Sequence, residues 1–214
     1  MHRLDRTGQR IVGVLIEKQL SVPDSYPLSE NALVDGCNQK SNRDPITELE
    51  TFQIAGALMA LQEQGWVARV EGGSRVAKFK HRAAEVLELD AHGLAVFAEL
   101  LLRGPQAPGA LKPRVARMGY HADADAIDAL LRGFAARKPA LVELLPLGPR
   151  ERDRRWRHLL GDGSEGIPAP APVAAAPAAV VPGPAPTPDL AARVDALERQ
   201  VADLRREIAE LRGR

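Results

Sequence analysis

The sequence is poor in aromatic residues and has almost no net charge. Phe, Trp and Tyr make up 4% of the 214 residues, so a folded core has to be built from Leu, Val, Ile and Ala. There are 29 Lys and Arg against 28 Asp and Glu, which gives a net charge of +1. A balance this even creates no strong overall field toward polyanions or membranes. Any affinity for nucleic acid must therefore come from local patches of positive charge.

The sequence also lacks a second cysteine and any long apolar run. Because Cys37 has no partner in the chain, no internal disulfide can form, which is typical of a reducing compartment. No stretch reaches the roughly 18 apolar residues that a membrane-spanning helix needs, and the first residues do not resemble a signal peptide. These absences predict a cytoplasmic protein without membrane contact. We expect Cys37 to be a small buried packing residue and not a nucleophile.

Catalytic and metal-binding patterns are missing as well. The five histidines are scattered, and none stands with a cysteine at the spacing of a zinc site. No Gly-x-x-x-x-Gly-Lys loop for phosphate follows a strand-forming segment. We therefore expect no catalytic residue, no metal ion and no cofactor, and a protein that is not an enzyme.

Near residue 161 the composition changes abruptly. Eight prolines lie between Pro168 and Pro188, among Ala and Gly. Proline fixes φ and has no backbone donor, so residues 162–188 are predicted to form an extended, semi-rigid linker. The residues before it mix apolar and charged side chains as globular domains do.

An apolar heptad pattern follows the linker, within residues 189–214. Its β-branched residues at one core position and leucines at the other favour a parallel two-stranded coiled coil. We therefore expect homodimerisation through this tail, and the alternative is an amphipathic helix that docks on its own domain. The seam consists of Leu190, Val194, Leu197, Val201, Leu204, Ile208 and Leu211.

Residues 1–84 are predicted to form three helices followed by a β-hairpin. Ser29 is placed to cap the second helix. The third helix ends at Gly65, and it begins either with a capping box at Thr47 or with a cap near Glu50. Strand-forming residues on both sides of a Gly-Gly turn then predict the hairpin.

Residues 85–161 repeat this order. Asp90 is placed to cap a first helix that Gly104 closes, and a basic helix follows. Pro139 stops the third helix, and two strand-forming segments come after it. Three helices and a hairpin, found twice, predict two tandem winged-helix domains: a mainly α fold with small β-hairpins.

Several strings of the sequence resemble the YceH family of bacterial proteins, over roughly residues 8–161. The resemblance implies a tandem winged-helix fold and carries no activity with it. The matching strings lie at residues 17–20, 26–33, 37–45, 73–78, 101–109 and 158–160.

One stretch departs from the family pattern. Ala107 and Ala110 stand where the family has Thr and Glu. Pro113 then falls inside the expected second helix of the second domain, where proline costs about 3 kcal/mol. This helix is therefore predicted either to start near Lys112 or to be kinked.

The third helices of both domains are acidic at their start. No Lys or Arg occurs between Asp44 and Ala68, around the third helix of the first domain. The third helix of the second domain opens with Asp123 and Asp125. Winged-helix and related proteins usually place this helix in the major groove of DNA. Because the phosphates would repel these carboxylates, we expect no standard insertion of the third helix.

Basic residues gather in other places, where they could hold phosphates without reading sequence. Ordinary solvated hairpin faces are the alternative explanation. The candidate contact residues are Lys40 and Arg43 before the third helix, Arg69, Arg75, Lys78 and Lys80 in the first wing, Arg103, Lys112, Arg114 and Arg117 around the second helix of the second domain, and Arg152, Arg154 and Arg155 in the second wing.

Two functions fit this pattern. The first is a nucleic-acid-associated or regulatory protein that binds DNA weakly through its basic wings. The second is a protein–protein adaptor, in which the acidic third helices meet a basic partner. The acidic helices favour the adaptor, and the basic wings favour nucleic acid.

Overall fold

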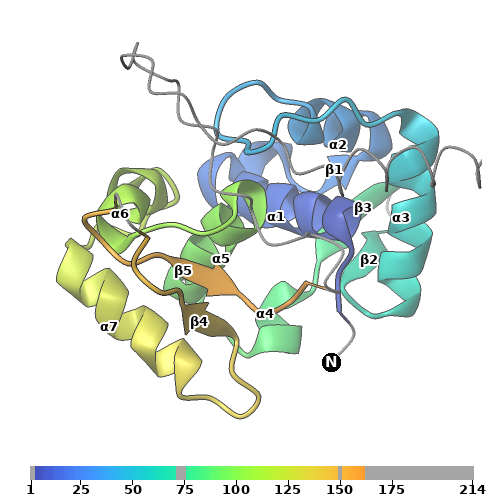
Figure 1. The fold of residues 1–214 in the computed structure, drawn as a ribbon. Helices are drawn as coiled ribbons and strands as arrows, with labels where there is room; N and C mark the ends of the chain where they lie inside the picture. Colours follow the sequence, from blue (N-terminus) through green and yellow to red (C-terminus); the bar gives the residue numbers. More distant parts are fainter. Residues whose placement is uncertain (1–2, 71–75, 149–150, 162–214) are drawn as a thin grey trace, which may run out of the picture. The chain divides into compact units, whose positions relative to one another are not determined.

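The chain is mainly helical, with two small antiparallel sheets, in a computed structural model that describes residues 3–70, 76–148 and 151–161 (Figure 1). This confirms the predicted mainly α fold class. The first half contains α1 (Arg6–Ser21), a 3-10 turn (Pro23–Ser25), β1 (Leu28–Ser29), α2 (Glu30–Cys37), α3 (Thr51–Glu63), β2 (Val67–Val70) and β3 (Lys78–His81). The second half contains α5 (Ala91–Arg103), α6 (Pro108–Ala116), α7 (Ala124–Ala135), β4 (Val142–Leu144) and β5 (Trp156–His158), and α4 (Ala83–Leu87) connects the halves.

Most helices begin where a side chain caps the first turn. A carboxylate or hydroxyl oxygen accepts a hydrogen bond from a backbone amide that has no partner within the helix. The caps are Asp5 for α1, Ser29 for α2, Asp90 for α5 and Asp123 for α7. The structure confirms the predicted caps at Ser29 and Asp90. It also decides between the two predicted starts of α3, because Glu50 forms a capping box with Gln53.

The structure contradicts one of the two alternatives for Pro113, a helix that starts near Lys112, and the predicted kink stays a prediction. The helix begins at Pro108 and not near Lys112. Proline is well suited to this first position, since its φ is already helical and its missing amide would have had no partner there. Pro113 lies within the helix and removes one internal hydrogen bond, whose acceptor Gly109 is exposed to solvent.

Both predicted hairpins are present. β2 and β3 pair antiparallel, and β1 adds to the other edge of β3, giving the order β1-β3-β2. β4 and β5 form the second hairpin, with Val142 opposite His158. An isolated bridge joins Gln106 to Trp156, in the place that β1 takes in the first half. In each half, the segment between the first two helices therefore pairs with the last strand.

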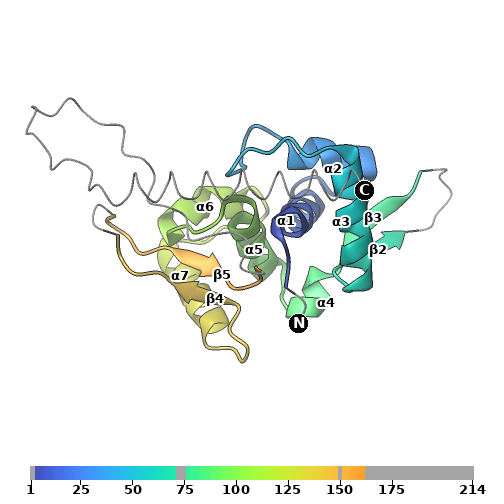
Figure 2. The ribbon, with the colours of Figure 1, turned by 45° about the vertical axis from the view of Figure 1, so that its right-hand side comes forward.

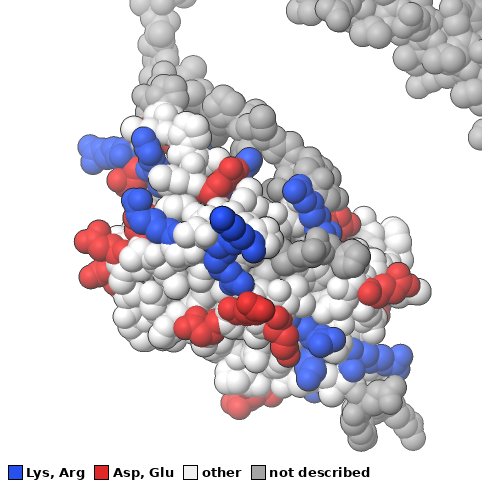
Figure 3. Space-filling view, turned by 90° about the horizontal axis from the view of Figure 1, so that it is seen from below, with Lys and Arg blue, Asp and Glu red and all other residues white. Residues whose placement is uncertain are grey.

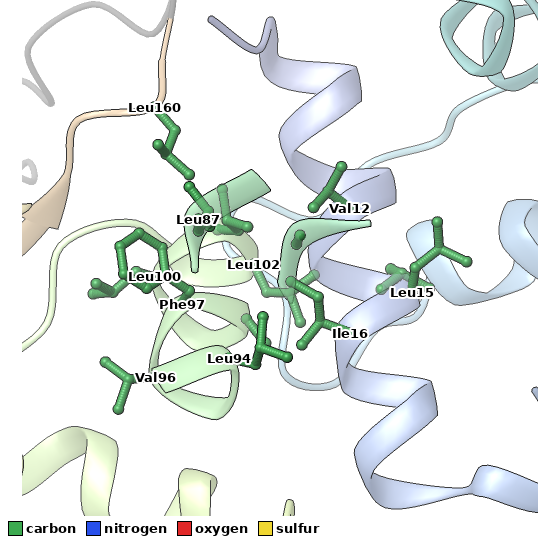
Figure 4. Close-up of a cluster of buried hydrophobic side chains, with 14 of the residues drawn as sticks. Val12, Leu15, Ile16, Leu87, Leu94, Val96, Phe97, Leu100, Leu102 and Leu160 are labelled. Carbon is green, nitrogen blue, oxygen red and sulfur yellow. The ribbon is translucent and has the colours of Figure 1, made fainter. Parts of the chain in front are cut away.

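The two halves share one hydrophobic core, at whose centre α1 and α5 lie side by side (Figures 1 and 2). Ten consecutive residues are buried in each of these helices, from Gly8 to Glu17 and from Gly93 to Leu102. A helix buried on every side has neighbours all around it. Each helix packs against its own half and also against the other, as Figure 4 shows for side chains of both.

Two close approaches hold the halves together. A Cβ atom at Gly13 of α1 would lie 3.0 Å from Leu102 of α5, so glycine is needed for this approach. Just before the start of α1, the amide of Leu4 donates to the carbonyl of Leu160 at 2.8 Å, within a parallel bridge to Gly161. The start of the first half is thus bonded to the end of the second. The predicted linker and coiled coil lie outside the described residues.

Candidate interaction surfaces

The described cations of the first wing are exposed, but they do not share one face. Lys78 and Lys80 alternate with buried Phe79, so both project from the same side of β3. Arg69 is opposite Phe79 in the sheet and therefore belongs to the other face. Arg75 lies outside the described residues. The structure brings together two of the four predicted wing cations, Lys78 and Lys80.

In the second wing, ion pairs neutralise part of the positive charge. Arg155 bonds to Glu151 at 2.5 Å, and Arg157 pairs with Glu143 on the opposite strand. Arg152 and Arg154 are exposed. Figure 3 shows positive and negative side chains interspersed over one face of the molecule.

The predicted basic run around α6 is divided by the fold. Lys112 on this helix and Arg117 directly after it are exposed, and Arg103 is half-buried at the end of α5. Arg114 turns toward the first half and donates to Asn42 Oδ1 at 2.8 Å. Its role is therefore a contact between the two halves.

Arg43 is buried, so its prediction as a phosphate or partner contact is corrected. Its guanidinium binds both carboxylate oxygens of Glu17, at 3.2 and 2.6 Å, and its Nε donates to the carbonyl of Gly36. Only 4% of the residue is exposed. A guanidinium satisfied in this way within the protein cannot bind an external phosphate. Lys40, in the same segment, is exposed.

Residues 38–45 join both halves through Asn42. Its side-chain amide donates to Glu17 of α1 at 3.2 Å and to Glu99 of α5 at 2.8 Å. The amide of Asp44 adds a bond of 3.0 Å to the carbonyl of Leu102. This segment thus has a structural role, since it bonds to helices of both halves. Such a role is expected for a run rich in Asn, Gln and Ser. Glu17 and Glu99 were not predicted as part of a site, although each is an acid within an apolar run.

The two buried carboxylates have opposite pKa shifts. Burial raises the pKa of Glu99, and the hydrogen bond from Asn42 and the charge of Arg114 offset this only in part. Burial also acts to raise the pKa of Glu17, but the hydrogen bond and charge of Arg43 outweigh it, and the pKa is lowered. Within the described residues, Oε2 of Glu99 has no hydrogen-bond partner.

Cys37 and two histidines are packing residues. Cys37 is fully buried, and burial raises the pKa of its thiol to about 12, which confirms the expected packing role. Burial lowers the pKa of His81 and of His158 to about 4, so both stay neutral at physiological pH. Among residues 3–70, 76–148 and 151–161, no three His, Cys, Asp or Glu side chains are grouped as metal ligands.

The acids at the start of α7 serve the fold. Asp123 caps the helix by accepting from the amide of Ala126 at 2.8 Å. Asp128 accepts from the indole nitrogen of Trp156 at 2.8 Å and pairs with Arg132 at 2.7 Å. Contacts within the protein thus involve the carboxylates of Asp123 and Asp128, whereas Asp125 is exposed to solvent.

By contrast, α3 carries apolar side chains on its outer side as well as its inner side. Ile54, Leu58 and Leu61 are buried in the core. On the outer side Phe52 is 75% exposed and Met59 is 65% exposed. Exposed apolar side chains that share one face of a helix can form the kind of patch that is a common sign of a protein-binding surface. We call the part of α3 formed by Phe52, Ala55, Gly56 and Met59 the outer face of α3.

In the part of the chain that the structure describes, no helix is long and apolar enough to cross a membrane.

Comparison with known proteins places the chain among bacterial relatives. The family model described as "Protein of unknown function, DUF480" matches residues 4–151. The UPF0502 protein of Dechloromonas aromatica is 42% identical over 97% of this chain and 95% of its own length. That of Hahella chejuensis is 40% identical over 89% of each chain, and that of Geotalea daltonii is 46% identical over 73% of this chain and 72% of its own. These matches confirm the resemblance found in the sequence, and the chain belongs to the DUF480 family of bacterial proteins.

Proposed function

We propose that this chain is a non-enzymatic tandem winged-helix protein that acts as a protein–protein adaptor through α3. The repeated order of three helices and a hairpin supports the winged-helix assignment. The pairing of β1 with β3, matched by the bridge between Gln106 and Trp156, supports it further. The last strand of each half thereby receives a short partner from the segment after the first helix.

The exposure of Phe52 and Met59 carries the adaptor proposal. In winged-helix proteins that read DNA, the third helix enters the major groove. Here that helix presents two large apolar side chains outward, and no Lys or Arg occurs between Asp44 and Ala68. Such a face suits the apolar centre of a protein interface, where Phe and Met are enriched. α3 also lies at the right-hand edge of the described ribbon in Figure 1.

Site-specific photo-crosslinking tests the adaptor function. The full chain, with benzoylphenylalanine in place of Phe52, is irradiated in living bacterial cells, and crosslinked peptides are identified by mass spectrometry. We expect a discrete crosslinked protein. The matched control carries the same group at Leu147, which is 50% exposed and lies in the second half. Absence of a crosslink at position 52, or the same products from both positions, would contradict the adaptor function.

Weak, sequence-independent DNA binding is a second candidate, and the shared face of Lys78 and Lys80 favours it. Each phosphate contact contributes about −0.9 to the slope of log affinity against log salt. Replacing both lysines with Gln should therefore flatten the slope by about 2 in an anisotropy titration of random duplex DNA. Glu50→Gln should leave the slope unchanged. Tight, sequence-selective binding that is lost on changing α3 would contradict this mechanism.

The heptad seam in residues 189–214 is our proposed homodimer contact. Its alternation of β-branched residues and leucines supports a parallel pair of helices. A dimeric adaptor presents two copies of α3, which increases avidity for a partner that is itself multivalent. We propose the cytoplasm as its location because the chain has a single cysteine.

A further inference from the structure

We infer that the outer face of α3 binds a basic amphipathic helix of a partner protein. This inference rests on the adaptor function proposed above and specifies the chemistry of the partner. It follows from three properties of the face: the spacing of its apolar side chains, the small residues between them, and the charge around it.

The apolar side chains are spaced to meet a helix. Phe52 and Met59 are seven residues apart, which is two turns and about 10 Å along the axis. Between them lie Ala55 and Gly56, and a Cβ atom added at Gly56 would meet no other atom within 4 Å. A facing helix can place one apolar side chain over these small residues and others beside Phe52 and Met59. Helices bound in this way are anchored by apolar residues at i, i+3 or i+4 and i+7.

The charges close to α3 in sequence favour a positively charged partner. Four carboxylates are exposed close to α3 in sequence, and no cation occurs from residue 45 to residue 67. Glu63 is one turn beyond Met59, on the same side of the helix. Lys or Arg beside the apolar stripe of a partner would be attracted here, whereas phosphates or an acidic helix would be repelled. The exposed carboxylates are Asp44, Glu48, Glu50 and Glu63.

A helical partner also suits what α3 can offer. The backbone amides and carbonyls within α3 are bonded inside the helix, so a partner meets side chains only. An extended peptide gains affinity mainly from main-chain bonds to a sheet edge, and this face has no such edge. A helix satisfies its own backbone and needs only side-chain contacts.

The test uses two synthetic helical peptides that share one leucine stripe. One peptide carries Lys on both sides of the stripe, and the other carries Glu at the same positions. Each is labelled with fluorescein and titrated with the full chain in an anisotropy assay. We expect the Lys peptide to bind at least about tenfold more tightly than the Glu peptide, with a preference that declines as salt is added.

Variants of the full chain locate the binding. Phe52→Ser should weaken the Lys peptide at least about tenfold, which is about 1.4 kcal/mol. Met59→Ser serves as a second, independent test of the same face. Leu147→Ser removes another exposed apolar side chain, 50% exposed and in the second half, and should leave affinity unchanged. Thermal unfolding of each variant shows that it is folded.

Equal affinity for the two peptides would overturn the inference, as would Lys-peptide binding that persists in both Phe52→Ser and Met59→Ser. The crosslink at position 52 separates this inference from the adaptor function. A crosslink to a partner segment without Lys or Arg, or to residues 189–214 of a second copy, would overturn the basic helix and leave α3 as a docking site. If neither the crosslink nor the preference for the Lys peptide were found, both the adaptor function and the basic-helix inference would be overturned.

Discussion

Asn42 donates a hydrogen bond of 2.8 Å to Oε1 of Glu99, although the two residues are 57 positions apart. The same side chain accepts from Arg114 at 2.8 Å through Oδ1. Asn42 has a φ of 55°, a left-handed conformation that Asn adopts more readily than most residues. One amide side chain thus connects residues 38–45 with α5 and α6.

The stability of Glu99→Gln relative to the unchanged chain should be greater at neutral pH than at acid pH. Because burial raises the pKa of Glu99, the folded state holds this proton more tightly than the unfolded chain. The stabilising contribution is present below the unfolded pKa, about 4.3, and is lost as pH rises through the folded pKa. The neutral Gln does not titrate. Arg114, Arg103 and Glu17 also act on this carboxyl, and all three remain in the variant.

Urea unfolding at about pH 5 and pH 8 measures this difference. The free energy of unfolding of Glu99→Gln, relative to the unchanged chain, should increase from the lower to the higher pH. Glu88→Gln is the control, since the side chain of Glu88 is 82% exposed. A difference that is the same at both pH values would contradict the raised pKa of Glu99.

Arg43→Met should destabilise the fold by about 3–5 kcal/mol, because it leaves the buried carboxylate of Glu17 without its ion-pair partner. Lys40→Met, in the same segment but exposed, should change stability by less than about 0.5 kcal/mol. Chemical denaturation at neutral pH provides both values. If the two variants were equally stable, Arg43 would not be a structural residue.

Leu58 and Met59 are neighbours in α3, but Leu58 is buried in the core and Met59 is exposed to solvent. Leu58→Ala should cost about 2–5 kcal/mol, because Leu58 is 2% exposed and its removal leaves a cavity. Met59→Ala should stay within about 0.5 kcal/mol, because the side chain is 65% exposed. The two midpoints of denaturation give the comparison. Comparable losses would mean that the outer face is covered by the protein itself.

Gly13→Ala should reduce stability where α1 approaches α5. The added Cβ would lie 3.0 Å from Leu102, and overpacking of this kind costs about 1–3 kcal/mol. Gly133→Ala, on α7, meets no atom within 4 Å and gains the same helix propensity. The free energy of unfolding of Gly13→Ala should therefore be lower than that of Gly133→Ala by about 1–3 kcal/mol. Thermal unfolding followed by circular dichroism measures this gap.

Truncation after Pro186 should convert a dimer into a monomer. The variant lacks the whole heptad seam and keeps residues 4–151, which match the family model. Light scattering after size-exclusion chromatography measures the mass of each form. A mass per particle that still corresponds to two chains would show that the dimer contact lies in the body.

Local signals made much of the fold predictable. Ser29 and Asp90 are recognisable as caps from their own neighbourhoods, because a cap bonds an amide only a few residues away. The stripe of Ile54, Leu58 and Leu61 likewise predicts the buried side of α3 from spacing alone. The start of α6 at Pro108 was not predicted, although proline is well suited to the first turn of a helix.

Contacts between distant residues were not predictable in this way. Nothing near Asn42 in the sequence indicates that it meets Glu99, and the burial of Arg43 follows from the position of α1 and not from its own segment. Phe52 and Met59 were not identified, because an apolar residue on a helix is normally assigned to the core. Only the packing of α3 through its other stripe shows that these two side chains face solvent.

The bridge between Leu4 and Gly161 joins the beginning and the end of the folded part of the chain. With both ends bonded and α1 buried against α5, neither half can separate without exposing the leucine-rich surface of the other. The halves are thus expected to melt in a single cooperative transition, as one domain would. The two halves are then expected to form one thermodynamic unit, in which α3 and α7 keep fixed positions relative to each other.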